Sequence, residues 1–354
     1  MRADENIKVG ISIGDINGIG CEVILKTFAD ARMLDLCTPV IFGSTKTISF
    51  QRKQLHIKID YTGIDNAAKA LPGKVNVVNV WKEAPKVNFG EETKEGGKYA
   101  ILSLEAAVNA LKKKEIDVLV TAPVNKHNIQ TEKFTFPGHT DYLAKELKGE
   151  ALMFMVTDEL KVGLLTDHVP VKDVSSHLNA KLIENKIKKV YKSLRKDFRI
   201  IKPKIAVLGI NPHSGDNGVI GTEDDQLLKP VIKKISDEGR LVYGPFSADS
   251  FFGSNNYNKF DAVIAAYHDQ GLIPFKTLSF GAGVNFTAGL DRVRTSPDHG
   301  TAYEIAGKGE ADHHSFEEAV FKAISIFRNR KEFEEISANP LQKISLKQQP
   351  KKQA

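Results

Sequence analysis

The sequence predicts an α/β protein built on a largely parallel or mixed sheet. Short apolar runs alternate with longer amphipathic stretches along most of the 354 residues, which is the pattern of strands connected by helices. Several apolar runs are unbroken and rich in β-branched residues, as is typical of strands buried on both faces. No linker-like composition interrupts this alternation before the C-terminal tail. Any division into domains is therefore expected to be a crossing of the chain rather than a flexible hinge.

Apolar periodicity places the individual elements. Helices are predicted where apolar residues recur three or four positions apart, as Ile101, Leu104 and Val108 do. The predicted helices are Tyr99–Lys114, Ala180–Lys196, Glu223–Glu238 and Phe316–Phe333. Strands are predicted where a short apolar run is bounded by turn residues. The predicted strands are Lys8–Ile13, Pro39–Gly43, Val75–Val80, Asp117–Thr121, Leu152–Val156, Val162–Thr166, Lys204–Gly209, Asp261–Tyr267 and Val284–Thr287.

Composition argues against several classes of protein. The net charge is +6, but the segment 340–354 holds four lysines and no acidic residue, so this basic tail, expected to be disordered, accounts for most of the excess. No basic stripe interleaved with aromatic residues predicts nucleic-acid binding, and no apolar run is long enough to span a membrane. The N-terminus does not resemble a secretory signal. The two cysteines, Cys21 and Cys37, are predicted to be buried and reduced, so a cytoplasmic location is expected.

Three predicted strands are followed by a histidine in a turn. His168 follows Val162–Thr166, His213 follows Lys204–Gly209, and His268 follows Asp261–Tyr267. Ligand sites of open α/β sheets form beyond the carboxyl ends of the strands. If these strands are neighbours, three imidazoles converge on one crevice, as in a catalytic zinc site with an open fourth position. Each histidine taken alone is better explained as a loop residue with a local hydrogen bond.

Two further clusters suit an anionic ligand. His139 and Thr140 follow a Pro-Gly turn at a predicted helix start, where backbone amides can bind anions, although a plain turn and N-cap would look the same. Lys276, Asn285 and Arg294 lie beside glycine-rich segments, and arginine can bind phosphate or carboxylate with two parallel hydrogen bonds. An ordinary basic surface is the alternative for that cluster.

One glycine-rich turn is not predicted to bind a dinucleotide. The stretch Gly14-Asp-Ile-Asn-Gly-Ile-Gly follows a strand, but it lacks the Gly-x-Gly-x-x-Gly spacing, and no phosphate-loop lysine follows it. Tight turns and close packing account for these glycines better.

Taken in order, the motifs resemble the 4-hydroxythreonine-4-phosphate dehydrogenase family of pyridoxal phosphate synthesis. The resemblance extends to about residue 330 and departs from the family pattern at Ile16-Asn17, Cys21, Asp141 and Ala288. It is carried by Gly14-Asp-Ile-Asn-Gly-Ile-Gly, Pro137-Gly-His-Thr, Asn211-Pro-His-Ser-Gly, Tyr267-His-Asp-Gln-Gly-Leu and Arg294-Thr-Ser-Pro-Asp-His-Gly-Thr. The segment from His299 also resembles the adenine-side cofactor loop of isocitrate and isopropylmalate dehydrogenases.

The resemblance implies a two-domain α/β/α fold like that of isocitrate and isopropylmalate dehydrogenases, with the active site in the inter-domain cleft. The first domain would comprise residues 1–130 and 290–335, including the cofactor loop. The second, 131–289, would carry the metal ligands and the contacts of a homodimer. The third histidine of the metal set is expected from the partner subunit, so that the two subunits would share each active site.

Site roles also follow from the resemblance. The family's metal ligands are matched by His168, His213 and His268. The expected metal is zinc, with magnesium, manganese or cobalt as alternatives. Matches to substrate contacts are His139, Thr140, Lys276, Asn285 and Arg294, and matches to the NAD or NADP loop are His299, Gly300 and Thr301. Asp249 and Asp269 are candidates for orienting the ligands.

The implied reaction is the oxidation of 4-phosphohydroxy-L-threonine by NAD, followed by loss of carbon dioxide. A sister dehydrogenase of 4-phospho-threonate or 4-phospho-erythronate is the first alternative. A zinc hydrolase and a non-catalytic protein that binds phosphorylated metabolites are the others. The cofactor-like segment at His299 would go unexplained in a hydrolase.

Overall fold

The computed structural model describes residues 6–131, 134–136 and 138–340, and it confirms the α/β class. The strands form one twelve-stranded sheet in the order β3-β4-β2-β1-β5-β12-β11-β6-β7-β10-β8-β9. They are β1 Lys8–Ser12, β2 Thr38–Gly43, β3 Tyr61–Ile64, β4 Val75–Asn79, β5 Val118–Thr121, β6 Gly149–Val156, β7 Lys161–Leu164, β8 Lys204–Leu208, β9 Leu241–Phe246, β10 Ala262–Ala265, β11 Val284–Leu290 and β12 Val293–Pro297.

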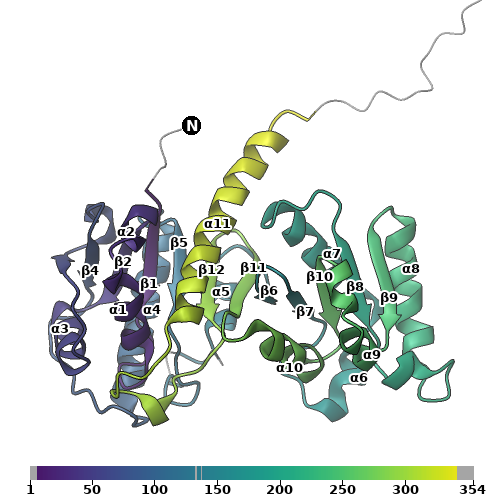
Figure 1. The fold of residues 1–354 in the computed structure, drawn as a ribbon, viewed down its shortest axis with the longest axis horizontal. Helices are drawn as coiled ribbons and strands as arrows, with labels where there is room; N and C mark the ends of the chain where they lie inside the picture. Colours follow the sequence, from purple (N-terminus) through teal and green to yellow (C-terminus); the bar gives the residue numbers. More distant parts are fainter. Residues whose placement is uncertain (1–5, 132–133, 137, 341–354) are drawn as a thin grey trace, which may run out of the picture.

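The sheet consists of two parallel halves joined in the middle (Figure 1). The strands from β3 to β12 in the sheet order are all parallel, as are those from β7 to β9. Between them, β11 is antiparallel to both β12 and β6, and β6 is antiparallel to β7. The two halves therefore run in opposite directions, and the central strands come from distant parts of the sequence. The predicted division into domains 1–130 with 290–335 and 131–289 stays a prediction.

The helices pack against both halves of the sheet. Side chains cap several of their N-termini, since Thr93 accepts from Gly96 N at α4 (3.0 Å) and Asn179 accepts from Leu182 N at α7 (2.9 Å). The α-helices are α1 Gly20–Ala29, α2 Met33–Leu36, α3 Thr45–Gln54, α4 Lys94–Lys112, α5 His139–Glu146, α6 Val174–His177, α7 Ala180–Lys196, α8 Lys229–Asp237, α9 Ala248–Gly253, α10 His268–Ser279 and α11 His314–Ser337.

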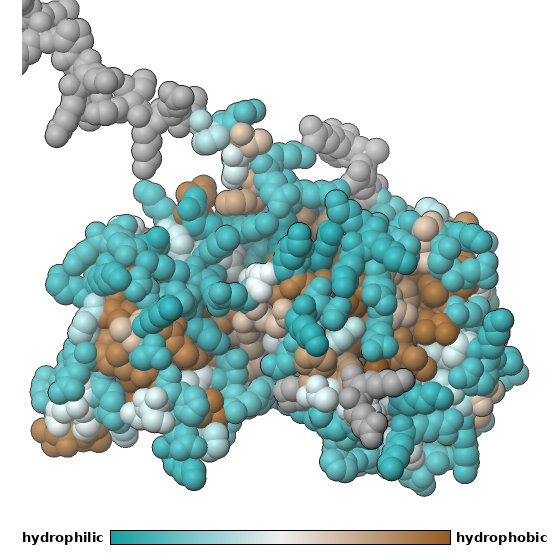
Figure 2. All heavy atoms as spheres, turned by 180° about the vertical axis from the view of Figure 1, so that it is seen from behind, coloured by the Kyte–Doolittle hydropathy of each residue, from teal (hydrophilic) through white to brown (hydrophobic). Residues whose placement is uncertain are grey.

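Every predicted strand and helix has a counterpart among these elements, and both cysteines are buried and free, as predicted. Within the described residues, no helix is both long and apolar enough to cross a membrane. Hydrophilic residues cover most of the face seen in Figure 2, with hydrophobic residues visible between them. The basic tail was predicted to be disordered; its residues 341–354, like Pro137 of the Pro-Gly turn, lie outside the described residues.

The glycines of the turn after β1 allow close packing, as predicted. Gly14 has a φ of +67°, and a Cβ there would lie 2.1 Å from the carbonyl oxygen of Pro123. A Cβ on Gly18 would lie 2.8 Å from the carbonyl oxygen of Thr301. These glycines let the turn pack directly against two segments that border the candidate site.

Candidate active site

A cavity of about 880 Å³ lies where the two halves of the sheet meet. The first half contributes the segment after β5, the start of α5 and strand β12, and the second half contributes the segments after β7 and β10. Most of the residues predicted for the site line it. These are His139, Thr140, His168, His268, Lys276, Asn285, Arg294, His299 and Gly300.

Two of the three strand-end histidines lie side by side. The strand order β7-β10-β8 makes the strands neighbours, and the rings of His168 and His268 have centroids 5.6 Å apart. Burial, then the charge of Lys126, lowers the pKa of His168 and favours its neutral form, the form that binds metals. The Nδ1 of His268 is 2.6 Å from Asp269 Oδ1, so Asp269 orients that ring and leaves Nε2 free.

His213 does not join this pair within one chain. It lies in the short 3₁₀ helix Pro212–Gly215 with a left-handed backbone (φ 52°), and it is absent from the cavity lining. Its charge acts on Asp249 instead, whose pKa is lowered first by a hydrogen bond from Ser247. Among the described residues no three histidine, cysteine or acidic side chains are grouped as a metal site. One chain therefore offers two imidazoles in one place and a third elsewhere.

Arg294 is a buried cation without a carboxylate partner among the described residues. The side chain, on β12, is 2% exposed. Its Nε and Nη2 donate to Thr121 Oγ1 (3.2 and 2.6 Å), and its Nη1 donates to Thr287 Oγ1 (3.0 Å). Burial lowers its pKa to about 9, because a charge loses its hydration there. The two hydroxyls accept three of the five N–H groups of the guanidinium and leave two for a ligand.

Several other polar atoms of the wall lack a hydrogen-bond partner among the described residues. His139 Nε2, Asn285 Oδ1 and His299 Nε2 are all shielded from solvent in this state. Burial also holds the pKa of His139 well below its usual range, so that ring is neutral. Buried polar atoms are costly unless paired. Their convergence on one cavity indicates that a polar ligand completes their hydrogen bonds.

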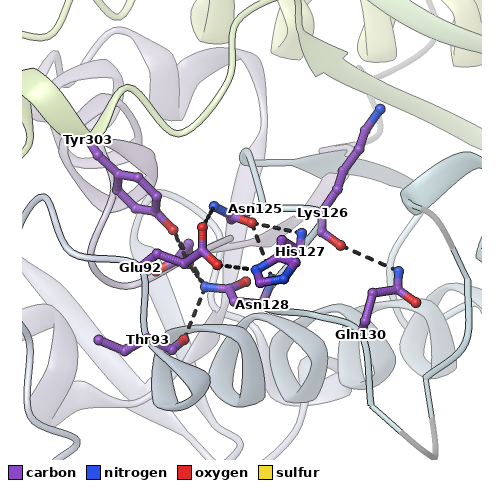
Figure 3. Close-up of polar contacts among 9 residues, drawn as sticks. Glu92, Thr93, Asn125, Lys126, His127, Asn128, Gln130 and Tyr303 are labelled. Carbon is purple, nitrogen blue, oxygen red and sulfur yellow. Dashed lines mark hydrogen bonds and ion pairs between the residues drawn. The ribbon is translucent and has the colours of Figure 1, made fainter.

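The segment that follows β12 is fastened to the first half of the sheet. Tyr303 OH donates to the buried Asp15 Oδ2 (2.8 Å), which also accepts from Asn128 Nδ2 (2.6 Å). Asn128 Nδ2 further donates to the Thr93 carbonyl (3.1 Å), and Figure 3 shows Tyr303, Thr93 and Asn128 meeting. Thr301, predicted for the cofactor loop, accepts from Ile19 N through its carbonyl (3.0 Å) and does not line the cavity.

Sequence reasoning missed part of the site. Lys126 and Lys186 line the cavity, and Lys186 Nζ lies 3.5 Å from Asp167 Oδ1. Lys126 follows β5 within Ala122-Pro-Val-Asn-Lys, and the strand-end rule that selected the histidines would have selected it too. The carboxylate of Asp15 was overlooked because it lies in the turn that was read only for its glycines.

Comparison with known proteins gives a consistent answer. Residues 35–323 match the family model described as pyridoxal phosphate biosynthetic protein PdxA. The chain is 46% identical over 342 residues to 4-hydroxythreonine-4-phosphate dehydrogenase of Bacteroides thetaiotaomicron, covering 96% of this chain and 94% of that protein. It is 35% identical to D-threonate 4-phosphate dehydrogenase of Cupriavidus necator over 327 residues, 91% of this chain and 98% of that one.

The fold is shared with a solved enzyme of the same name. The crystal structure of 4-hydroxythreonine-4-phosphate dehydrogenase from Klebsiella pneumoniae superposes with a TM-score of 0.79 at 31% identity, covering 92% of this chain and 99% of that one. On these grounds the chain belongs to the PdxA family of pyridoxal phosphate biosynthetic proteins.

Proposed function

We propose that this chain oxidises 4-phosphohydroxy-L-threonine at C3 with NAD or NADP, as a step of pyridoxal 5'-phosphate biosynthesis. The hydride from C3 passes to the nicotinamide and the hydroxyl proton is released. The resulting 3-oxo acid loses its carboxylate as carbon dioxide and takes up a proton at C2, which gives 3-amino-2-oxopropyl phosphate. The observation that carries the proposal is the buried, unpaired guanidinium of Arg294 in a cavity with two adjacent imidazoles.

The residues of the cavity fit a divalent metal, but as an incomplete set. His168 and His268 bring two imidazole nitrogens together in one place, which suits zinc or another transition metal, and among the described residues no third candidate ligand is grouped with them. We propose that His213 of a second copy completes the set, which makes the active enzyme a homodimer. When bound, such an ion would act as a Lewis acid toward the C3 oxygen.

The chain's own groups would orient the substrate around that point. Arg294 would bind an anionic group through its two remaining N–H groups, with His139 and Thr140 at the start of α5 beside it. Lys276 Nζ donates to the Asp298 carbonyl (3.0 Å) at the cavity edge, where it could pass a proton toward C2 or contact the carboxylate. Asn285 contributes an unpaired oxygen to the same wall. A cytoplasmic location, in keeping with two free cysteines, completes the proposal.

The test is NADH formation by metal-loaded enzyme, followed by absorbance, with 4-phosphohydroxy-L-threonine, 4-phospho-D-threonate and 4-phospho-D-erythronate compared. We expect turnover of the amino acid. Turnover of only the acids that lack the amine would replace the proposal with the sister activity, which the relative in Cupriavidus necator is named for. No NADH from any of them would overturn the proposed dehydrogenase activity.

The hydrogen bond from Tyr303 to Asp15, called the clamp below, should position the segment after β12 and so affect the affinity for the cofactor. We expect Tyr303→Phe to raise the KM for NAD about tenfold with little change in kcat, since one hydrogen bond of ~1.5 kcal/mol that positions the loop is lost. Tyr99→Phe is the control, because it removes the same hydroxyl from a hydrogen bond to Glu83 (3.0 Å) outside the cavity lining. Equal KM values for NAD in both variants would contradict a role for the clamp.

A further inference from the structure

The ammonium group of Lys126 faces the cavity without a carboxylate partner among the described residues. Lys126 lines the cavity wall, and the hydrogen bond it makes is through its backbone carbonyl, which accepts from Gln130 Nε2 (3.4 Å). Figure 3 shows its side chain extending away from the polar cluster around it. Like Arg294, it is thus a cation of the cavity wall for which the described residues supply no carboxylate partner.

The backbone that carries Lys126 is held on both sides. Asn125 Oδ1 accepts from His127 N (2.8 Å) and Asn128 N (3.2 Å), and Asn125 Nδ2 donates to Glu92 Oε2 (2.7 Å). The His127 ring contacts Glu92 as well. In the run from Asn125 to Asn128, Lys126 is therefore the side chain left out of this network. The backbone of Lys126 is thus ordered before a ligand binds, while its ammonium group is available for contact. This ordering lowers the entropy cost of binding.

The charge of Lys126 acts at the start of α5. An added Cβ on Gly138, the residue before α5, would lie 3.9 Å from Lys126 Cε. Burial is the first cause of the lowered pKa of His139, and the charges of Arg294 and then Lys126 add to it. Among the described residues no side chain caps the N-terminus of α5, so its first amide N–H groups are available to a ligand. His139 Nε2 is buried there without a partner.

We propose that Lys126 binds the phosphate of the substrate, together with the first turn of α5. This inference rests on the proposed function. A phosphate dianion is matched by an ammonium charge, backbone amides and the hydroxyl of Thr140. Asp141 lies in the same turn and also lines the cavity, so a phosphate bound there needs a cation beside it. Arg294 is then left for the carboxylate end of the substrate.

Binding of two unreactive probes separates the phosphate from the carboxylate. O-phospho-L-homoserine lacks the C3 hydroxyl and cannot be oxidised, and its carboxamide also lacks the carboxylate. By calorimetry we expect Lys126→Met to raise the Kd of both probes by the same factor, about 10- to 100-fold for one charge-assisted contact. Lys126→Arg should restore part of the affinity. Weakening of the acid but not of the carboxamide would assign Lys126 to the carboxylate and overturn the proposal.

Lys145→Met is the matched control. Lys145 lies on α5, its Nζ 5.1 Å from the centroid of the Phe136 ring and outside the cavity lining, so its loss removes one positive charge from the same region without removing a group of the cavity wall. An equal loss of probe affinity in both variants would mean that long-range charge explains the effect, and the proposed contact between Lys126 and the phosphate would be wrong. In the reaction, Lys126→Met should raise the KM for the substrate and leave kcat nearly unchanged. If the wild-type enzyme oxidises none of the acids but Lys126→Met still weakens both probes equally, the proposed function fails and the phosphate contact stands.

Discussion

Replacing Arg294 with methionine should lower kcat/KM by about 10³-fold, close to 4 kcal/mol, because the substrate loses a buried, charge-assisted anchor. Stability should change little. The variant loses hydrogen bonds to Thr121 and Thr287, but it no longer buries a charge that has no counter-ion. In the wild-type protein the burial of the Arg294 charge is therefore unfavourable, and an anionic ligand would compensate for it.

A second buried arginine gives the matched contrast. Arg330 on α11 is 7% exposed, and its Nε donates to the buried Asp197 Oδ1 at 2.7 Å. Arg330→Met leaves that carboxylate unpaired and should destabilise the fold by about 3–5 kcal/mol, while the fraction that folds remains active. Thermal unfolding and steady-state kinetics on both variants check the pair. A destabilised but active Arg294→Met protein would contradict the assignment of Arg294 to the substrate.

The sequence was sufficient for the alternation of strands and helices, but it missed three strands: β12 in the middle of the sheet and β3 and β9 at its edges. Strands such as β2 and β10 are fully buried, so burial and apolar composition coincide in them. Strand β12 was not predicted, because Val293-Arg-Thr-Ser-Pro contains more polar residues than apolar ones. Arg294 and Ser296 line the wall of the cavity, and Thr295 Oγ1 donates to the Ala319 carbonyl of α11 (2.7 Å).

The same limit applies to the site. The strand-end rule correctly brought His168 and His268 together, since it depends only on β7 and β10 being neighbours. It could not foresee that the left-handed turn at His213 keeps that ring away from the pair within one chain. Such a turn depends on contacts distant in sequence, for example Asp224 accepting from Ile210 N and Asn211 N (2.8 and 3.0 Å). Pattern alone gives the position of a residue along a strand but not the direction of its side chain.

Heterodimers of two inactive variants should recover activity when the variants lie on opposite sides of a shared site. His168→Ala and His213→Ala homodimers should each lose their bound zinc and at least 10⁴-fold in activity, as expected when a metal ligand is removed from a catalytic centre (roughly 5–6 kcal/mol). Co-expressed with different affinity tags, they should form a heterodimer in which one of the two sites keeps a complete ligand set. That species should have about half the wild-type activity and half its zinc.

The control pairs His168→Ala with His268→Ala. These residues line the same cavity of the same chain, with ring centroids 5.6 Å apart, so each site of that heterodimer lacks one of them and should remain inactive. Recovery in this second heterodimer would mean that His168 and His268 act in different sites. No recovery in the first would mean that His213 is not donated by the partner, and the metal would then have to be held by the two adjacent imidazoles with ligands of another kind.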